Sequence, residues 1–113
     1  MILKLPKQIY ISSSNVDMRK SINGLSYIVT SQFKLDVFSD ALFVFHNKHC
    51  NKVKMLYWNR EGFCLLYKQL ERAKFRFPKI LETDVYTISN EELEWLLHGL
   101  HFEDLHYAKS IKK

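Results

Sequence analysis

Four short apolar runs separated by turns of a few residues are the feature that most constrains how this chain can fold. They cover residues 41–47, 53–59, 63–69 and 74–78, and each has the length and the aromatic and apolar content of a strand. Residues 59–62, Asn-Arg-Glu-Gly, have the composition of a hairpin turn. Because parallel strands need long crossover connections, these spacings predict an antiparallel β-meander.

Helices are predicted before and after this meander. Residues 8–13 are expected to form a first strand. Apolar residues then recur at helical spacing as far as Phe33, with Asp17 as the expected N-cap. Ser89 and Glu92 have the spacing of a capping box, which predicts a second helix that ends near Gly99. We therefore expect an α+β fold: an antiparallel β-meander packed against an N-terminal helix, with a C-terminal helix.

The size and composition of the chain predict one ordered domain over residues 1–113. The chain is 47% hydrophobic, with three glycines and two prolines, which is typical of a globular domain and not of a disordered chain. Apolar runs are too short for a signal-peptide core or a membrane span, so we expect a cytoplasmic protein without a membrane partner. Cys50 and Cys64 are then expected to be free thiols.

Positive charge is concentrated in the middle of the chain. Residues 48–79 hold nine basic residues against Glu61 and Glu71, a net charge of +7, whereas the whole chain has a net charge of +5. Lys and Arg neutralise phosphates and exposed aromatic rings can stack on bases, so this segment favours a nucleic acid as partner. The basic residues are Lys48, Lys52, Lys54, Arg60, Lys68, Arg72, Lys74, Arg76 and Lys79.

Strict alternation divides the strand residues into two sets that are expected to lie on opposite faces of the sheet. The basic face has two interpretations. It is either a platform for nucleic acid, or an ordinary solvent-facing surface, in which case Trp58 belongs to the core. The more apolar set, expected to face the first helix, is Val53, Met55, Tyr57, Phe63, Leu65, Tyr67, Phe75 and Phe77. The basic set is Lys54, Leu56, Trp58, Cys64, Leu66, Lys68, Lys74 and Arg76.

Catalytic and metal-binding motifs are not evident in the sequence. The five histidines and two cysteines lack the paired spacing of zinc ligands, so solvated histidines are the simpler interpretation. The acidic residues are explained as a cap, loop residues and an exposed helix face, and not as a two-metal nuclease site. A thiol nucleophile at Cys64 remains an alternative without a recognisable activating context. We expect no catalytic residue, metal, cofactor or small-molecule substrate.

Arg19, Lys20 and Ser21 form a second candidate phosphate site. They fall in the expected first turn of the N-terminal helix, where free backbone N–H groups and adjacent cations favour phosphate. Asp17 partly neutralises this end of the helix.

Several short motifs follow one another in a fixed order along the chain. They are Asp17-Met18-Arg19-Lys20-Ser21, Gly24-Leu25, Leu42-Phe43-Val44-Phe45, Lys54-Met55-Leu56-Tyr57-Trp58, Gly62-Phe63-Cys64-Leu65, Tyr67-Lys68, Leu70-Glu71 and Phe75-Arg76-Phe77-Pro78. Together they resemble the TnpB accessory protein of insertion sequence 66 elements, a family distinct from the RNA-guided nucleases of the same name. The resemblance runs from about residue 8 to about residue 100. The chain departs from the family pattern at residues 47–52, which are rich in Lys and Asn.

The resemblance implies a small non-catalytic partner in DNA transposition, which acts beside a separate, larger transposase encoded by the same element. Our leading hypothesis is that the basic sheet face binds DNA and helps the transposase. The alternative is a protein–protein adaptor for the transposase without direct DNA binding, in which acidic residues and Leu96 and Leu97 of the last helix take part. The candidate DNA contacts are Arg19, Lys20, Lys54, Trp58, Lys68, Arg72, Lys74 and Arg76.

Overall fold

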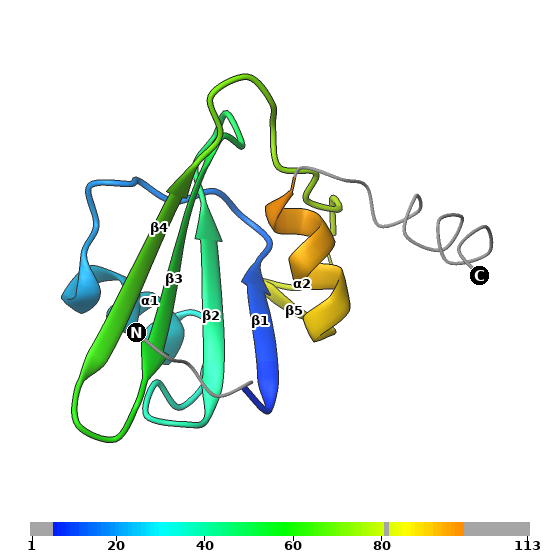
Figure 1. Cartoon of the computed structure of the whole chain (residues 1–113). Helices are drawn as coiled ribbons and strands as arrows, with labels where there is room; N and C mark the ends of the chain where they lie inside the picture. The colour runs from blue at the N-terminus through cyan, green and yellow to red at the C-terminus, as the bar shows by residue number, and fades with distance from the viewer. Residues whose placement is uncertain (1–5, 81, 99–113) are drawn as a thin grey trace.

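A computed structural model describes residues 6–80 and 82–98 as a five-stranded mixed sheet with two helices (Figure 1). The strands lie in the order β4-β3-β2-β1-β5. The predicted α+β class is confirmed. The elements are β1 (Gln8–Ser12), α1 (Ile22–Ser31), β2 (Ala41–His46), β3 (Lys52–Trp58), β4 (Phe63–Gln69), β5 (Val85–Ile88) and α2 (Asn90–Leu97).

The strands β2, β3 and β4 form an antiparallel meander, as the short connections predict. The hairpin between β3 and β4 closes across Asn59, whose backbone N–H donates to the carbonyl of Gly62 at 3.1 Å. The Asn59 side-chain oxygen accepts the N–H groups of Glu61 at 3.2 Å and Gly62 at 3.1 Å. A side chain that bonds to the backbone two or three residues on stabilises a tight turn.

The arrangement around this meander differs from the expected one. The first helix follows β1, and β1 pairs parallel with β2, so α1 lies in the long connection that a parallel pair requires. The other side of β1 pairs antiparallel with β5, a strand that was not predicted from the sequence. The sheet is therefore mixed.

The prediction of a strand at residues 74–78 is wrong, because this segment has no regular secondary structure. Phe75 is 2% exposed and lies in the core, and its backbone N–H donates to the carbonyl of Cys50 at 2.7 Å. The alternation of Phe75 and Phe77 arises because these rings pack onto a face of the sheet from outside.

The prediction that Asp17 caps the first helix is also wrong. The helix α1 begins at Ile22, and its N-cap is Ser21, which makes no side-chain capping bond. Asp17 does accept the backbone N–H of Arg19 at 2.9 Å, but in a separate turn that precedes the helix. Asp side chains favour such turns as readily as helix caps, since both use the same short-range bond.

The capping box of the second helix is confirmed. The backbone N–H of Glu92 donates to Ser89 Oγ at 3.0 Å, and the backbone N–H of Ser89 donates to Glu92 Oε1 at 2.9 Å. The predicted end of this helix near Gly99 lies outside the described residues. Neither helix within residues 6–80 and 82–98 has the length and the apolar run needed to cross a bilayer.

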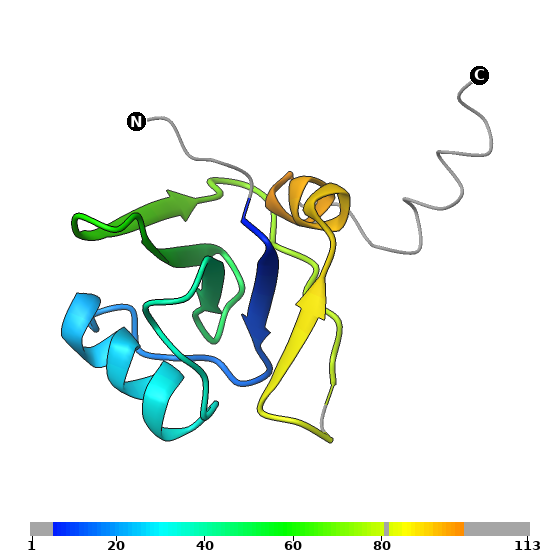
Figure 2. The same cartoon turned by 90° about the horizontal axis from the view of Figure 1, so that it is seen from below.

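The sheet separates two apolar clusters, one covered by α1 and the other by α2 (Figure 2). The central strand β2 is therefore covered on both faces, which explains why all six of its residues are buried. The buried residues on the α1 side are Leu25, Ile28, Val29, Phe33, Val37, Ala41, Phe43, Phe45 and Leu56. Those on the α2 side are Ile9, Ile11, Leu42, Val44, Val53, Met55, Tyr57, Phe75 and Leu96.

The pairing of β3 with β4 overturns the predicted division into two faces. Trp58 pairs with Phe63, so odd-numbered residues of β3 lie opposite even-numbered residues of β4. Lys54 and its partner Tyr67 consequently lie on the α1 side, with Leu56 and Leu65. Lys68 lies on the α2 side, beside Val53. The predicted basic face is thus divided between the two sides of the sheet, and Lys74 and Arg76 lie outside it.

Candidate nucleic-acid interface

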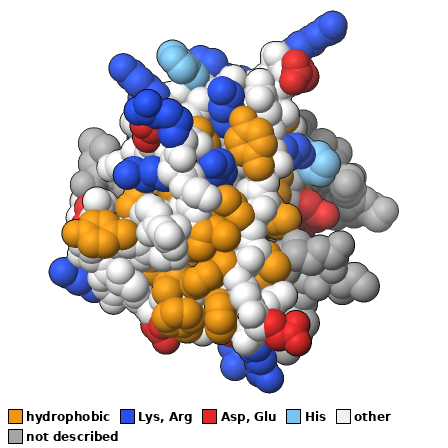
Figure 3. Space-filling model, turned by 90° about the vertical axis from the view of Figure 1, so that its left-hand side faces the viewer, with side chains coloured by type: hydrophobic (Ala, Val, Ile, Leu, Met, Phe, Trp, Pro, Cys, Tyr) orange, Lys and Arg blue, Asp and Glu red, His pale blue; other side chains and the backbone are white. Residues whose placement is uncertain are grey.

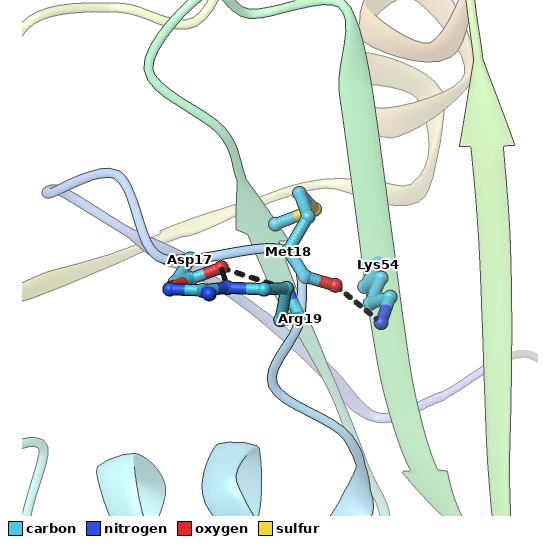
Figure 4. A network of polar contacts seen from close by, with 4 residues as sticks. All are labelled: Asp17, Met18, Arg19 and Lys54. Carbon is cyan, nitrogen blue, oxygen red and sulfur yellow. Dashed lines mark hydrogen bonds and ion pairs between the residues drawn. The ribbon is translucent and has the colours of Figure 1, made fainter.

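Residues 15–20 cross one end of the sheet and are held there by Lys54. The Lys54 ammonium donates to the carbonyl of Met18 at 2.7 Å (Figure 4). It also donates to the carbonyl of Lys20 at 2.9 Å. The backbone N–H of Val16 donates to the carbonyl of His46 at 2.8 Å, which ties the segment to the end of β2. Lys54 therefore positions this segment by bonding to its backbone carbonyls.

Arg19 and Asp17 form an exposed ion pair on the same segment. The guanidinium of Arg19 donates through Nη2 to Asp17 Oδ2 at 2.6 Å and through Nε at 3.0 Å (Figure 4). The side chain of Arg19 is 91% exposed. Its hydrogen bonds to the carboxylate lower the pKa of Asp17 to about 2, so the carboxylate is charged at neutral pH.

The turn between β2 and β3 presents further cations next to this segment. The side-chain oxygen of Asn47 accepts the backbone N–H groups of Asn51 and Lys52, both at 3.0 Å. Cys50 has a φ of 56°, the left-handed conformation that closes the turn. Lys48 is exposed at the tip of this ordered turn.

Two neighbouring hollows connect the turn and the segment. One, of about 660 Å³, is lined by Asp17, Met18, Arg19, Lys52, Lys54 and Tyr67. The other, of about 330 Å³, shares Asp17, Met18 and Lys52 and is also lined by Asn15, Val16, Asn47, Lys48 and His49. We call Arg19, Lys48, Lys52 and Lys54 the basic end. Figure 3 shows Lys and Arg side chains gathered toward the upper part of this side of the molecule.

The structure brings only some of the predicted contacts together. Arg19 and Lys54 line one hollow, and Lys20 is the exposed next residue of the same segment. Lys68 lies on the α2 side, where its ammonium donates to the carbonyl of Leu97 at 2.8 Å. Trp58 lies at the opposite end of β3 from Lys52.

Three other predicted contacts lie on the segment after β4. This segment runs beside the turn between β2 and β3, because the N–H of Leu70 donates to the carbonyl of Asn51 at 2.9 Å. The three side chains are exposed, and they are Arg72, Lys74 and Arg76.

Lys48 and Lys52 are the basic-end residues that the predicted contact set omitted. The sequence contained a signal for them, because both belong to the charged stretch between two predicted strands, and a turn between paired strands must lie at an end of the sheet. What it lacked was the position of residues 15–20 relative to that turn.

Trp58 packs in an aromatic group at the other end of β3. Its ring meets Phe38 edge-on, with centroids 4.9 Å apart, and lies 4.9 Å from Phe63. Phe38 and Trp58 border a hollow of about 490 Å³ that Asp40 and Arg60 also line. Trp58 is half-buried, which lies between the exposed ring that the platform interpretation requires and the buried ring that the core interpretation requires.

Metal binding has no geometric basis in the described part of the chain, where no three His, Cys, Asp or Glu side chains lie close enough to hold an ion together. Cys50 and Cys64 are free thiols.

Comparison with known proteins identifies the family. The family model described as IS66 Orf2 like protein matches residues 7–107. The chain belongs to this family. The uncharacterized proteins y4jC and y4hO of Sinorhizobium fredii are 34% and 30% identical to it over 93 residues. Each alignment covers 82% of this chain, with 79% of y4jC and 80% of y4hO. No solved structure matches.

Membership of the IS66 Orf2-like family indicates an accessory role in transposition. The family is not one of known catalytic enzymes, and its context points to association with the transposase of the element. These points agree with the resemblance seen in the sequence motifs.

His46 is a buried residue at the end of β2, directly before the turn that belongs to the basic end of this IS66 Orf2-like protein. Its side chain is 7% exposed and stacks on Phe77 at 4.2 Å. The ring nitrogens lie 3.1 Å from the carbonyl oxygen of Ser12 and 3.3 Å from that of Asn47. Burial lowers the pKa of His46, although the two carbonyls act in the opposite direction.

We expect the protein to lose stability as the pH falls below about 6.5, the ordinary pKa of histidine. Below this pH, His46 is protonated in the unfolded chain but still neutral in the folded protein, and this difference favours unfolding. Its contribution to stability is therefore complete only above this pH. The loss from one such group is at most about 1.4 kcal/mol per pH unit. Urea unfolding between pH 5 and pH 8 measures it, and His46→Gln should flatten the profile. His49→Gln, at an exposed position, is the control; an equal flattening there would contradict the assignment.

Proposed function

We propose that this IS66 Orf2-like protein is a non-catalytic accessory of transposition that binds the DNA backbone through its basic end and helps a separate transposase act on that DNA. The observation that carries this proposal is the convergence of cations from residues 15–20, the turn between β2 and β3, and the start of β3 around two adjoining hollows. Cations that are distant in sequence but close in space can contact successive phosphates.

The surface suits phosphates better than base edges. Lys48 and Arg19 are exposed side chains on a turn and a loop, and no helix of the described chain projects from this end into solvent as a groove reader would. Backbone contacts carry little sequence information, so binding should be steeply salt-dependent and tolerant of sequence. Arg72, Lys74 and Arg76 extend the same surface along the segment after β4.

Two of the original candidate contacts have other roles in this proposal. The ammonium of Lys54 is engaged by two backbone carbonyls and orders the segment that carries Arg19. The ammonium of Lys68 is engaged by the end of α2. We therefore expect Lys48 and Lys52 to contribute more to DNA binding than Lys68 does.

The double variant Lys48→Gln/Lys52→Gln tests the proposal directly. Each lost phosphate contact should make the slope of log Kobs against log salt shallower by about one unit, so we expect a change of about two units. Fluorescence anisotropy with duplexes of unrelated sequence, at several salt concentrations, measures this slope.

The matched control is Lys7→Gln/Arg60→Gln, which removes the same charge from exposed residues at the opposite end of the sheet, before β1 and in the turn between β3 and β4. Its slope should stay close to that of the native protein. An equal change in both double variants would mean that net charge alone attracts DNA. No retention of DNA by the native protein even at low salt would refute the proposal.

Asp17→Asn should tighten DNA binding. In the native protein the Asp17 carboxylate pairs with the guanidinium of Arg19 and would repel a phosphate. The asparagine side chain of the variant has the same shape but no charge. We expect a steeper salt slope for Asp17→Asn and a shallower one for Arg19→Gln in the same titrations. A weaker affinity for Asp17→Asn would show that the ion pair is needed to orient Arg19.

The aromatic group at the far end of β3 favours a second candidate function, an adaptor that contacts the transposase without direct DNA binding. Phe38 is 57% exposed, and aromatic rings beside an arginine such as Arg60 are typical of protein interfaces. The expected use of Leu96 in this contact is not supported, because Leu96 is fully buried. Co-purification with the transposase after nuclease treatment, together with loss of co-purification in Phe38→Ala, would favour the adaptor.

A further inference from the structure

The outer edge of β4 pairs with no other strand among residues 6–80 and 82–98. This strand is the last of the sheet, and Figures 1 and 2 show no other described element beyond it. Its ladder with β3 is bounded by two backbone bonds, from Asn59 N–H to Gly62 and from Leu70 N–H to Asn51. In an antiparallel ladder, pairs that exchange backbone hydrogen bonds alternate with pairs that do not. The backbone N–H and C=O groups that therefore point away from β3 belong to Phe63, Leu65, Tyr67 and Gln69.

This edge lacks the usual protection of an exposed strand. It has no proline, and its pairing with β3 runs without a bulge from Lys52–Gln69 to Trp58–Phe63. The ammonium of Lys68, its cation, is bonded to Leu97 on the α2 side. Natural sheet edges are normally short, charged, bulged or interrupted by proline, because unpaired N–H and C=O groups pair with other chains.

The α1 side of the same edge is apolar. Phe63, Leu65 and Tyr67 all lie on this side, and Tyr67 is 52% exposed. Phe38, which is 57% exposed, contacts Phe63 with ring centroids 5.6 Å apart. Figure 3 shows hydrophobic side chains gathered over the middle and lower parts of this side, below the cations.

The sequence of β4 is complementary to itself. When two copies pair antiparallel about Leu65, Phe63 lies opposite the partner's Tyr67 and Leu65 lies opposite the partner's Leu65. All these residues have outward backbone groups, so each pair can exchange both hydrogen bonds. On the other side of the sheet, Cys64 meets the partner's Leu66 and Lys68 meets the partner's Gly62. Apolar and aromatic cross-strand pairs are stabilising, and no like charges face each other in this register.

We propose that a second copy of this chain is the occupant of the β4 edge, and that two sheets join there through a twofold β4–β4 pair centred on Leu65. This interaction is carried by the backbone edge and does not require DNA, although Tyr67 also lines one hollow of the basic end. It gives the protein an isologous dimer in which each copy uses the same surface.

Sedimentation equilibrium of the native protein and of Tyr67→Glu tests the proposal. The new carboxylate would lie opposite the partner's Phe63 in both halves of the pair, so we expect the dimer Kd to rise at least about tenfold. Thr87→Glu is the control, because it places the same charge at an exposed position on β5, the other edge of the sheet. Circular dichroism checks that all three proteins are folded.

A cysteine scan then tests the register. In a Cys50→Ser background, Leu66→Cys should form a covalent dimer with the partner's Cys64, because the two residues form a close non-hydrogen-bonded pair. Gln69→Cys, on the same strand but opposite the partner's Glu61, should not. A native protein that stays monomeric to high micromolar concentration would overturn the proposal. So would a dimer that Thr87→Glu weakens as much as Tyr67→Glu does, or equal cross-linking of both cysteine variants.

Discussion

Phe75→Ala is expected to lower the free energy of unfolding by about 3–5 kcal/mol, the range for removing a buried aromatic ring. Phe75 is 2% exposed and belongs to the cluster between the sheet and α2. It lies in a segment without regular structure, so few backbone bonds would hold the segment once the ring is gone. Urea unfolding followed by circular dichroism measures the loss.

Lys74→Ala is the control for Phe75→Ala. Lys74 is the exposed neighbour, and surface substitutions of this kind usually change stability by less than about 0.5 kcal/mol. A loss below about 1 kcal/mol for Phe75→Ala would contradict its place in the core. Because Arg72, Lys74 and Arg76 flank this ring, we also expect weaker DNA binding in the Phe75 variant under conditions where the rest of the fold persists.

Trp58→Ala is expected to cost about 2 kcal/mol of stability, less than the range for a fully buried ring. Its ring is half-buried and loses contacts with both Phe38 and Phe63. The hypothesis of a stacking platform predicts instead that Trp58→Ala leaves the free energy of unfolding unchanged and weakens the free energy of single-strand binding by about 1–3 kcal/mol per stacked base. We expect single-strand affinity to remain close to that of the native protein.

Phe38→Ala separates these two explanations for Trp58. Phe38 is more exposed, and its removal should cost less stability than the removal of Trp58. Unfolding and single-strand binding measured on both variants decide the role of the ring. Unchanged stability of Trp58→Ala together with a loss of single-strand binding would restore the platform hypothesis.

Local chemistry was sufficient to predict much of the secondary structure. The strands β2, β3 and β4 and the hairpin at Asn59 follow from short apolar runs and turn residues a few positions apart. The capping box of Ser89 and Glu92 is likewise formed by groups three residues apart. The motifs from Asp17 to Pro78 also pointed to the family to which the chain belongs.

Part of the basic end could be predicted in the same way. Arg19 was a candidate because the sequence placed it in the first turn of a helix. The helix begins only at Ile22, but Arg19 does line a basic hollow. Lys68 was grouped with Lys54 by alternation alone, and this grouping fails because the pairing of Trp58 with Phe63 shifts the parity between the two strands. A turn that is one residue longer or shorter reverses which side chains share a face, and composition does not reveal that length.

The sequence by itself determined the strands β2, β3 and β4, the hairpin at Asn59, the capping box of Ser89 and Glu92, and the concentration of positive charge in residues 48–79. The tertiary structure decided which strands lie together: β1 between β2 and β5, and Phe75 packed onto the sheet instead of within it. It also brought residues 15–20 against the turn that carries Lys48. The physical reason is that hydrogen bonds between near neighbours are encoded by adjacent residues, whereas pairing between distant strands depends on which apolar surfaces the whole chain can bury at once.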